Sequence, residues 1–159
     1  MIRLWRITRK AYRGGAFTGT RSASSGGRWN GIGRRAVYCS LSPALATLEI
    51  LVNTQITRLP NDYVIVPVDV PESTTRQVID TAGLPPDWQQ PGNQYCKELG
   101  DAWYSANRTL LLDVPSAVIP LERNIVINPR HPAFEDIDTS HVGYPLHFDP
   151  RLVALLYCE

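Results

Sequence analysis

The sequence has little cysteine and histidine, and the spacing of both is poor for a metal or redox site. Its 159 residues include three cysteines and three histidines. No C-x-x-C pair is present, and no two histidines have the H-x-x-x-H spacing that places two imidazoles on one helical face. These absences disfavour a zinc ribbon, a redox pair and a metalloenzyme. Three unpaired thiols are typical of the reducing cytoplasm, where we expect the protein to act.

Long apolar runs are also missing. No stretch approaches the roughly 20 residues that a membrane span needs, so we expect no membrane partner. The chain is 43% hydrophobic and 19% charged with a formal net charge of +1. That composition excludes intrinsic disorder, and the length is that of one domain with a sizeable core. We therefore predict a single domain over residues 1–159.

Acidic side chains are almost absent from the first part of the chain. Residues 1–61 contain ten Arg or Lys and a single carboxylate, Glu49, whereas the remainder contains six basic and fourteen acidic residues. A basic region favours a polyanionic partner, either a nucleic acid or a phosphorylated small molecule. Fourteen of the sixteen basic residues are arginines, whose planar guanidinium matches phosphate oxygens bidentately. The alternative is that these arginines form a solvated surface.

Glu49 lies within a predicted helix over residues 42–54. Ser42 is a good N-cap and Pro43 suits the first helical position. Three apolar residues at helical spacing are predicted to form a buried stripe, namely Leu45, Leu48 and Val52. Glu49 falls beside this stripe, so we expect it to be partly buried and to need a partner. Either it forms a structural pair with an arginine, or it has a functional role.

The other hydrophobic patterns predict short strands and a second helix over residues 93–108. Strands are predicted at residues 2–7, 36–40, 62–70, 76–80, 110–114, 117–120, 124–128, 141–148 and 152–157. This order of elements predicts an α+β fold with two main helices.

A loop rich in glycine and serine precedes the second predicted strand and ends in Gly26-Gly-Arg-Trp-Asn-Gly-Ile-Gly33. It has neither the G-K-[ST] ending of a P-loop nor the third glycine of a dinucleotide fingerprint. Glycines at this density allow a ligand to approach the backbone closely, although an ordinary loop would look the same. The candidate chemical residues are Arg28 in this loop, Tyr38 on the next strand, Glu49, and Ser116 far downstream.

These segments resemble the RES-domain toxins, the toxin halves of bacterial RES–Xre toxin–antitoxin modules. The resemblance runs from about Leu4 to Tyr157 and rests on residues 26–33, 36–38, 44–49 and 114–116. It implies an ADP-ribosyltransferase-like core of small β-sheets flanked by helices, acting on NAD⁺ as substrate without a metal. The catalytic residues that it implies are Arg28, Tyr38, Glu49 and Ser116. The NAD⁺-binding residues that it implies are Arg6, Arg28, Trp29, Asn30 and Tyr38.

The implied reaction breaks the nicotinamide–ribose bond and depletes cellular NAD⁺. Arginines can clamp the diphosphate, Tyr38 can stack on the substrate, and Glu49 can stabilise the cation that develops on the ribose. Ser116 is interpreted as a positioning hydroxyl, because no base is evident beside it. The implied partner is an Xre-type helix-turn-helix antitoxin that blocks the pocket, and a homodimer is compatible with the sequence.

Two alternatives stay open. The first is an ADP-ribosyltransferase that modifies a cellular protein. Arginine-directed transfer is disfavoured, because Thr47 stands where such enzymes carry Glu or Gln. The second is a nucleic-acid-binding protein that uses the basic first part of the chain and its aromatic residues. Direct nucleic-acid binding is the weaker alternative, because no nucleic-acid-binding motif is present.

Overall fold

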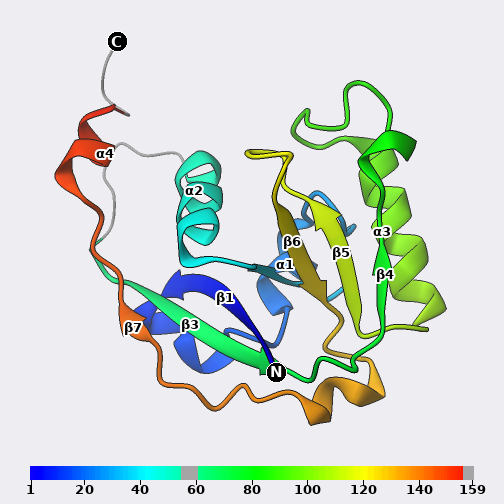
Figure 1. The fold of residues 1–159 in the computed structure, drawn as a ribbon, viewed down its shortest axis with the longest axis horizontal. Helices are drawn as coiled ribbons and strands as arrows, with labels where there is room; N and C mark the ends of the chain where they lie inside the picture. Colours follow the sequence, from blue (N-terminus) through cyan, green and yellow to red (C-terminus); the bar gives the residue numbers. More distant parts are fainter. Residues whose placement is uncertain (55–60, 156–159) are drawn as a thin grey trace.

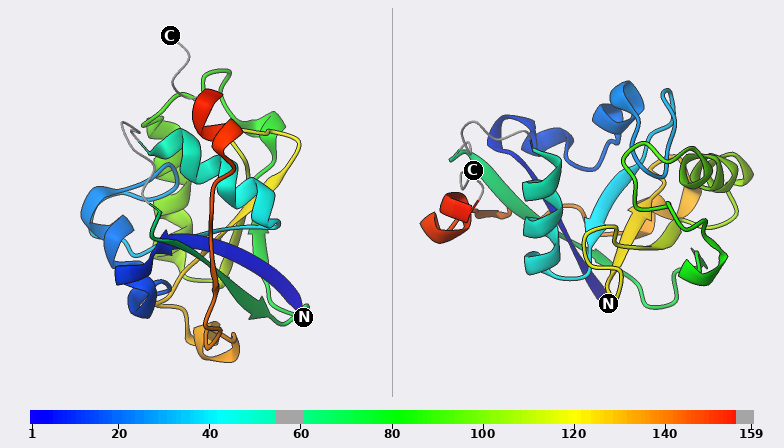
Figure 2. Two further views of the ribbon diagram at one scale, coloured as in Figure 1. Left: turned by 90° about the vertical axis from the view of Figure 1, so that its left-hand side faces the viewer. Right: turned by 90° about the horizontal axis from the view of Figure 1, so that it is seen from above.

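Seven strands form one mixed sheet in the order β4-β5-β6-β2-β1-β3-β7 in the part of the chain that the computed structural model describes, residues 1–54 and 61–155. The strands are β1 (Ile2–Arg9), β2 (Val37–Ser40), β3 (Tyr63–Val70), β4 (Arg76–Val78), β5 (Leu111–Pro115), β6 (Arg123–Ile127) and β7 (Tyr144–Pro145). The helices are α1 (Thr20–Ser25), α2 (Pro43–Asn53), α3 (Gln94–Ala106) and α4 (Pro150–Leu155). The 3₁₀ turns are η1 (Lys10–Gly15), η2 (Thr81–Gly83) and η3 (Pro132–Asp136). Helices α3 and α4 lie at opposite ends of the sheet (Figures 1 and 2).

The sheet divides into two halves that meet at a narrow junction. β1 pairs with β3 from Ile2 to Arg9, but with β2 only at Trp5 and Ser40. Figure 1 shows β1 and β3 running across the direction of β5 and β6. Helix α2 packs against both β1 and β2, and it therefore covers the junction. The narrow pairing leaves room between the halves for side chains and for a ligand.

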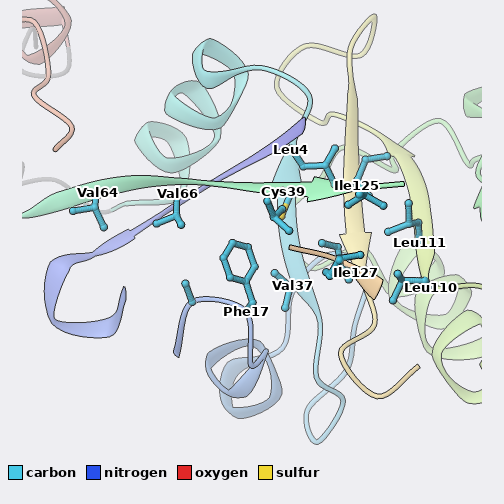
Figure 3. Close-up of a cluster of buried hydrophobic side chains, with 14 residues drawn as sticks. Leu4, Phe17, Val37, Cys39, Val64, Val66, Leu110, Leu111, Ile125 and Ile127 are labelled. Carbon is cyan, nitrogen blue, oxygen red and sulfur yellow. The ribbon is translucent and has the colours of Figure 1, made fainter. Parts of the chain in front are cut away.

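Two hydrophobic clusters pack against opposite faces of the β2-β6-β5 half, because successive residues of a strand point to opposite faces. One cluster includes Val37 and Cys39 of β2 together with Phe17, and it continues onto β3 (Figure 3). The other contains Trp29 and Trp103 and lies between the sheet and α3. This arrangement confirms the predicted α+β class.

Helix α2 begins where the sequence predicts, but the stripe assigned to its buried face is wrong. The Ser42 hydroxyl accepts a hydrogen bond from the backbone N–H of Leu45 at 3.1 Å, which is the expected cap. Leu48 and Val52 are 36% and 60% exposed. The buried residues of the helix are Leu45, Ala46 and Leu51. The reason is that α2 buries only the side that faces β1 and β2.

Three predicted strands are wrong in whole or in part. Residues 117–120 form a turn instead of a strand, residues 152–155 lie in α4, and the strand expected at 141–148 shrinks to β7. Residues 156 and 157 lie outside the described residues. Cys39 and Cys96 are free and buried. No helix in the described part is long and apolar enough to cross a membrane.

Candidate active site

Glu49 lies on α2 at the junction of the two half-sheets and is held by neutral donors. The Ser116 hydroxyl donates to Glu49 Oε1 at 2.8 Å, and the Asn124 side-chain amide donates to the same oxygen at 2.6 Å. Among the described residues, none donates a hydrogen bond to Oε2 and none forms an ion pair with Glu49. Of the two alternatives for Glu49, the structural pair with an arginine is therefore not formed within the described residues. In that part of the chain the carboxylate has no cationic partner, and its Oε2 accepts no hydrogen bond.

Ser116 directs its single proton toward Glu49. Its hydroxyl oxygen accepts hydrogen bonds from the backbone N–H groups of Val118 at 3.1 Å and Ile119 at 3.0 Å. These two donors occupy the acceptor sites of the hydroxyl, so the proton is left for the carboxylate. The same contacts turn the backbone after β5 and explain why residues 117–120 form no strand. Ser116 is fully buried, so it supports Glu49 from behind.

Asn124 begins a predicted strand, where the sequence allows it to cap a turn or to line the pocket, and it lies beside Glu49. It pairs in register with Ser40 across β2 and β6, and the Ser40 hydroxyl donates to Asn124 Oδ1 at 2.7 Å. This bond fixes the amide so that its nitrogen faces Glu49. Ser40 and Asn124 thus form a second support for the carboxylate, beside Ser116. The only signal in the sequence was the position of each residue on a predicted strand.

Tyr38 positions the glycine-rich loop. Its hydroxyl accepts from the backbone N–H of Trp29 at 3.0 Å and donates to Asn30 Oδ1 at 2.6 Å. Burial raises the pKa of Tyr38, so the hydroxyl keeps its proton for Asn30. A Cβ on Gly27 would lie 2.6 Å from the Tyr38 hydroxyl, which is why glycine is needed there. Trp29 and Asn30 are 2% and 1% exposed, so their side chains support the loop from within.

Arg28 binds the neighbouring loop through backbone carbonyls. Its guanidinium donates to Trp88 O at 2.6 Å, Gln90 O at 2.9 Å and Gln89 O at 3.1 Å. It also lies 6.0 Å from the centre of the Trp88 ring. All of these partners are neutral. Among the residues that the structure describes, Arg28 thus has no acidic partner, while the hydrogen bonds of its guanidinium fix one wall of the site.

Arg6 occupies the gap where β1 separates from β2. Its Nη1 donates to the carbonyl of Tyr38 at 3.0 Å and so links the two strands beyond their single paired position. Burial lowers the pKa of Arg6, although a guanidinium remains charged in proteins. Its Nε is buried and has no hydrogen-bond partner among the described residues. An unsatisfied buried donor on a cation fits an anionic ligand group, such as a phosphate oxygen.

These residues surround two adjoining cavities. The larger has a volume of about 820 Å³, and Arg28, Tyr38, Glu49 and Asn124 line it. The smaller, about 190 Å³, contains Arg6 and shares Tyr38, Glu49 and Asn124 with the larger one. The larger volume lies within the range of roughly 300–1,000 Å³ that is common for ligand sites. The pair therefore offers one ligand a carboxylate and four basic side chains, namely Arg6, Arg21, Arg28 and Lys97.

A second polar cluster lies on the edge of β3 and differs from the Glu49 site in its chemistry. Ligand atoms of Asp69, Asp138 and His141 lie within 4.8 Å of one another, close enough to share a metal ion. However, Arg3 Nε and Nη2 bind the two oxygens of Asp69, each at 2.7 Å. Arg3 first, and then His141, lower the pKa of Asp69 to about 2. The charge of Asp69 is thus already balanced, and we interpret the cluster as structural.

Comparison with known proteins gives concordant results. The RES domain matches residues 3–149. The chain is 36% identical over 151 residues to "Toxin Res" of Photorhabdus laumondii subsp. laumondii, an alignment that covers 94% of this chain and 96% of the relative. It is 35% identical over 154 residues to the "Prs ADP-ribosylating toxin" of Sphingobium sp. (strain YBL2), covering 94% and 95% of the two chains.

A solved structure shares the fold. The crystal structure of the M. tuberculosis MbcT–MbcA toxin–antitoxin complex contains a chain that superposes with a TM-score of 0.69. The superposition covers 97% of this chain and 87% of that chain, at 20% sequence identity. At this identity, the likeness concerns the fold alone.

Proposed function

The chain belongs to the RES-domain family, and from that premise we propose that it is the toxin of a toxin–antitoxin pair and that it cleaves the nicotinamide–ribose bond of NAD⁺. One relative is named an ADP-ribosylating toxin, and ADP-ribosylation draws on this same bond. The observation that carries the proposal is Glu49. Its carboxylate faces a cavity with a free oxygen and without a cationic partner among the described residues.

Glu49 supplies the charge that the reaction needs. When the bond breaks, both electrons leave with the nicotinamide nitrogen, and positive charge develops on the ribose. A carboxylate with no other counterion stabilises that charge, and a carboxylate already fixed in place does so without reorganising. Ser116 and Asn124 fix Oε1 from behind, which leaves Oε2 for the ribose. These two residues are positioning residues in this proposal.

The arginines hold the other end of the substrate. Arg6 lines the smaller cavity and offers its guanidinium to the diphosphate, whose charge compensates the buried cation. Arg28 contributes its positive charge to the larger cavity. The hydrogen bonds of its guanidinium hold residues 88–90 in place as one wall of that cavity. Tyr38 lines both cavities, and its hydroxyl holds Trp29 and Asn30 in the loop.

The remaining proposals concern partners and location. We place the protein in the cytoplasm with an Xre-type antitoxin that covers the cavity, and a homodimer stays compatible with the sequence. The related fold from M. tuberculosis was solved in complex with an antitoxin, which supports a protein partner. Val52 lines the cavity yet is 60% exposed, so it is a suitable contact for such a partner. Val52→Glu should weaken antitoxin binding and leave the fold intact, as measured by co-purification.

The test of the proposed reaction is NAD⁺ consumption by the purified chain, with Glu49→Ala beside the wild type. Chromatography should detect nicotinamide only with the wild type. The second product names the acceptor, because water yields ADP-ribose and phosphate yields its phosphate ester. Wild-type protein that binds NAD⁺ and never cleaves it would refute the proposal.

Transfer of ADP-ribose to a cellular protein is the second candidate. The 35% identity to a relative named an ADP-ribosylating toxin favours it. Incubating a lysate with labelled NAD⁺ and wild-type protein should then mark a discrete band, which Glu49→Ala should not mark. Release of free ADP-ribose with no labelled band would assign water as the acceptor instead.

A further inference from the structure

A third hollow lies apart from the two cavities around Glu49. It has a volume of about 340 Å³ and shares no lining residue with either of them. Its walls come from the segment after β1, from Arg35 in the segment before β2, and from the segment around η3. Val66 of β3 forms part of its floor, on the face of the sheet that carries the cluster in Figure 3. Nothing in the proposed reaction uses this hollow.

Two exposed arginines, Arg13 and Arg35, line the hollow. Neither side chain makes a hydrogen bond or an ion pair with any described residue. Most other arginines in the described ranges are bound, as Arg3 is by Asp69 and Arg123 is by Asp113. Two unpaired guanidinium groups at one hollow create a positive potential that an anion relieves. A phosphate group matches their planar forks best.

The rest of the hollow combines apolar residues with polar ones, the latter being Thr18, Thr139 and His141. Phe17 is 9% exposed and Val66 is 2% exposed, and Figure 3 shows both beside the core cluster under β3. Phe134 of η3, partly buried, lines the same hollow. A ligand that fills the hollow therefore needs a planar apolar body as well as a negative group. Its volume lies near the lower end of the range for small-molecule sites, which limits the ligand to about the size of a mononucleotide.

We propose that this hollow is a second binding site and that it takes a nucleoside monophosphate, with the phosphate on Arg13 and Arg35 and the base against Phe134. The partly buried ring of Phe134 offers a stacking surface for any base, so discrimination among bases should be weak. The proposal is independent of NAD⁺ cleavage, because none of these residues takes part in the proposed reaction.

The test is a calorimetric titration of the full chain with AMP, adenosine and inorganic phosphate. AMP should bind more tightly than either of the other two probes, because only AMP engages both parts of the hollow. The double variant Arg13→Gln/Arg35→Gln should weaken AMP binding at least about tenfold. Arg108→Gln is the matched control, since the Arg108 side chain is also exposed and without a partner among the described residues but does not line the hollow. It should change AMP binding less than about twofold.

The Arg6→Gln variant distinguishes AMP binding in this hollow from AMP binding in the cavities around Glu49. It should leave AMP binding within about twofold, whereas a loss with Arg6→Gln and none with the double variant would overturn the proposal. The absence of AMP binding to wild type at millimolar concentration would overturn it too, as would equal affinity for phosphate and AMP. The double variant should keep the rate of NAD⁺ consumption, so this result stands apart from the outcome for the proposed function.

Discussion

Two carboxylates of the molecule, Asp69 on β3 and Glu49 on α2, are held in opposite ways. Asp69 is bound at both oxygens by the guanidinium of Arg3 and also contacts His141. Glu49 is bound at one oxygen by a hydroxyl and an amide. Both regions contain well-formed polar contacts at short distances. The difference is the charge of the partners.

The difference separates a structural role from a chemical one. A carboxylate paired with an arginine has its charge balanced before any ligand arrives, and its effect on a developing cation is correspondingly small. A carboxylate held by neutral donors is fixed in position while its charge stays available. The first part of the chain contains ten basic residues, yet among the described ones none pairs with Glu49. We infer that the fold keeps these basic residues away from Glu49, so that the charge of Glu49 stays available to the substrate.

The largest expected effect is that of Glu49→Gln. A glutamine can accept the same two hydrogen bonds, so the fold should persist while the charge is lost. Nicotinamide release should fall by about 10²–10³-fold, the typical cost of one well-placed electrostatic group. Asp69→Asn is the matched control and should change the rate less than about twofold. A Glu49→Gln protein with more than a tenth of the wild-type rate would remove the distinction between the two carboxylates.

The support behind Glu49 should matter next. Ser116→Ala removes the proton donor to Oε1 and leaves the partly buried N–H groups of Val118 and Ile119 without an acceptor. We expect a rate loss of about tenfold or more and a loss of about 1–3 kcal/mol in the free energy of unfolding. Ser116→Thr keeps the hydroxyl and should recover a large part of the rate. Urea unfolding and nicotinamide release measure the two effects, and a stability loss with an unchanged rate would limit Ser116 to a structural role.

Arg28 and Lys97 line the same cavity. Comparing variants of the two residues therefore separates the effect of charge from the effect of geometry. Arg28→Lys keeps the charge but cannot satisfy the three carbonyls of residues 88–90 together. The KM for NAD⁺ should rise by several-fold, with a smaller change in kcat, and proteolysis near residues 88–90 should become faster. Lys97→Gln removes a charge without breaking a side-chain hydrogen bond to any described residue, and it should change KM less than about twofold. A larger rise in KM for Lys97→Gln than for Arg28→Lys would instead mean that Arg28 contacts the substrate through its charge alone.

The smallest expected effect concerns the pH dependence of stability. The pKa of Asp69 is lowered from 3.8 to about 2, so its contribution is fully present above about pH 4 and is lost as the pH falls toward 2. Asp69→Asn should therefore cost about 1 kcal/mol at pH 7, the scale of a well-formed surface ion pair, and almost nothing at pH 2. Urea unfolding at the two pH values checks this. A constant difference across that interval would contradict the ion-pair account.

The sequence predicted local features well. Ser42 and Pro43 marked the start of α2, and short apolar runs marked β1, β3, β5 and β6, because caps and apolar runs depend on neighbouring residues. The class of the fold followed from the order of these elements. The predicted burial of Leu48 and Val52 failed because helical spacing shows a stripe but not how much of it finds a partner. Val52 lines the cavity instead.

The partners of Glu49 could not be read from periodicity. Ser116 and Asn124 lie 67 and 75 residues from it in sequence, and they reach it through the pairing of β2, β5 and β6. Charge counting favoured an arginine for Glu49, because composition does not say which basic residues face which acid. Ser116 was a candidate chemical residue from the sequence, but nothing in its neighbourhood linked it to Glu49. Its role in turning residues 117–120 also explains the wrong strand there.

The most direct test of the central claim is the binding of a cationic ribose analogue, a hydroxylated pyrrolidine whose protonated ring nitrogen imitates the developing charge. Its affinity is compared with that of a neutral analogue of the same shape, for the wild type and for Glu49→Gln. The account predicts that Glu49→Gln weakens binding of the cation by at least about tenfold and leaves the neutral analogue within about twofold. Equal changes for both analogues would contradict the claim that Glu49 holds an uncompensated charge for the reaction.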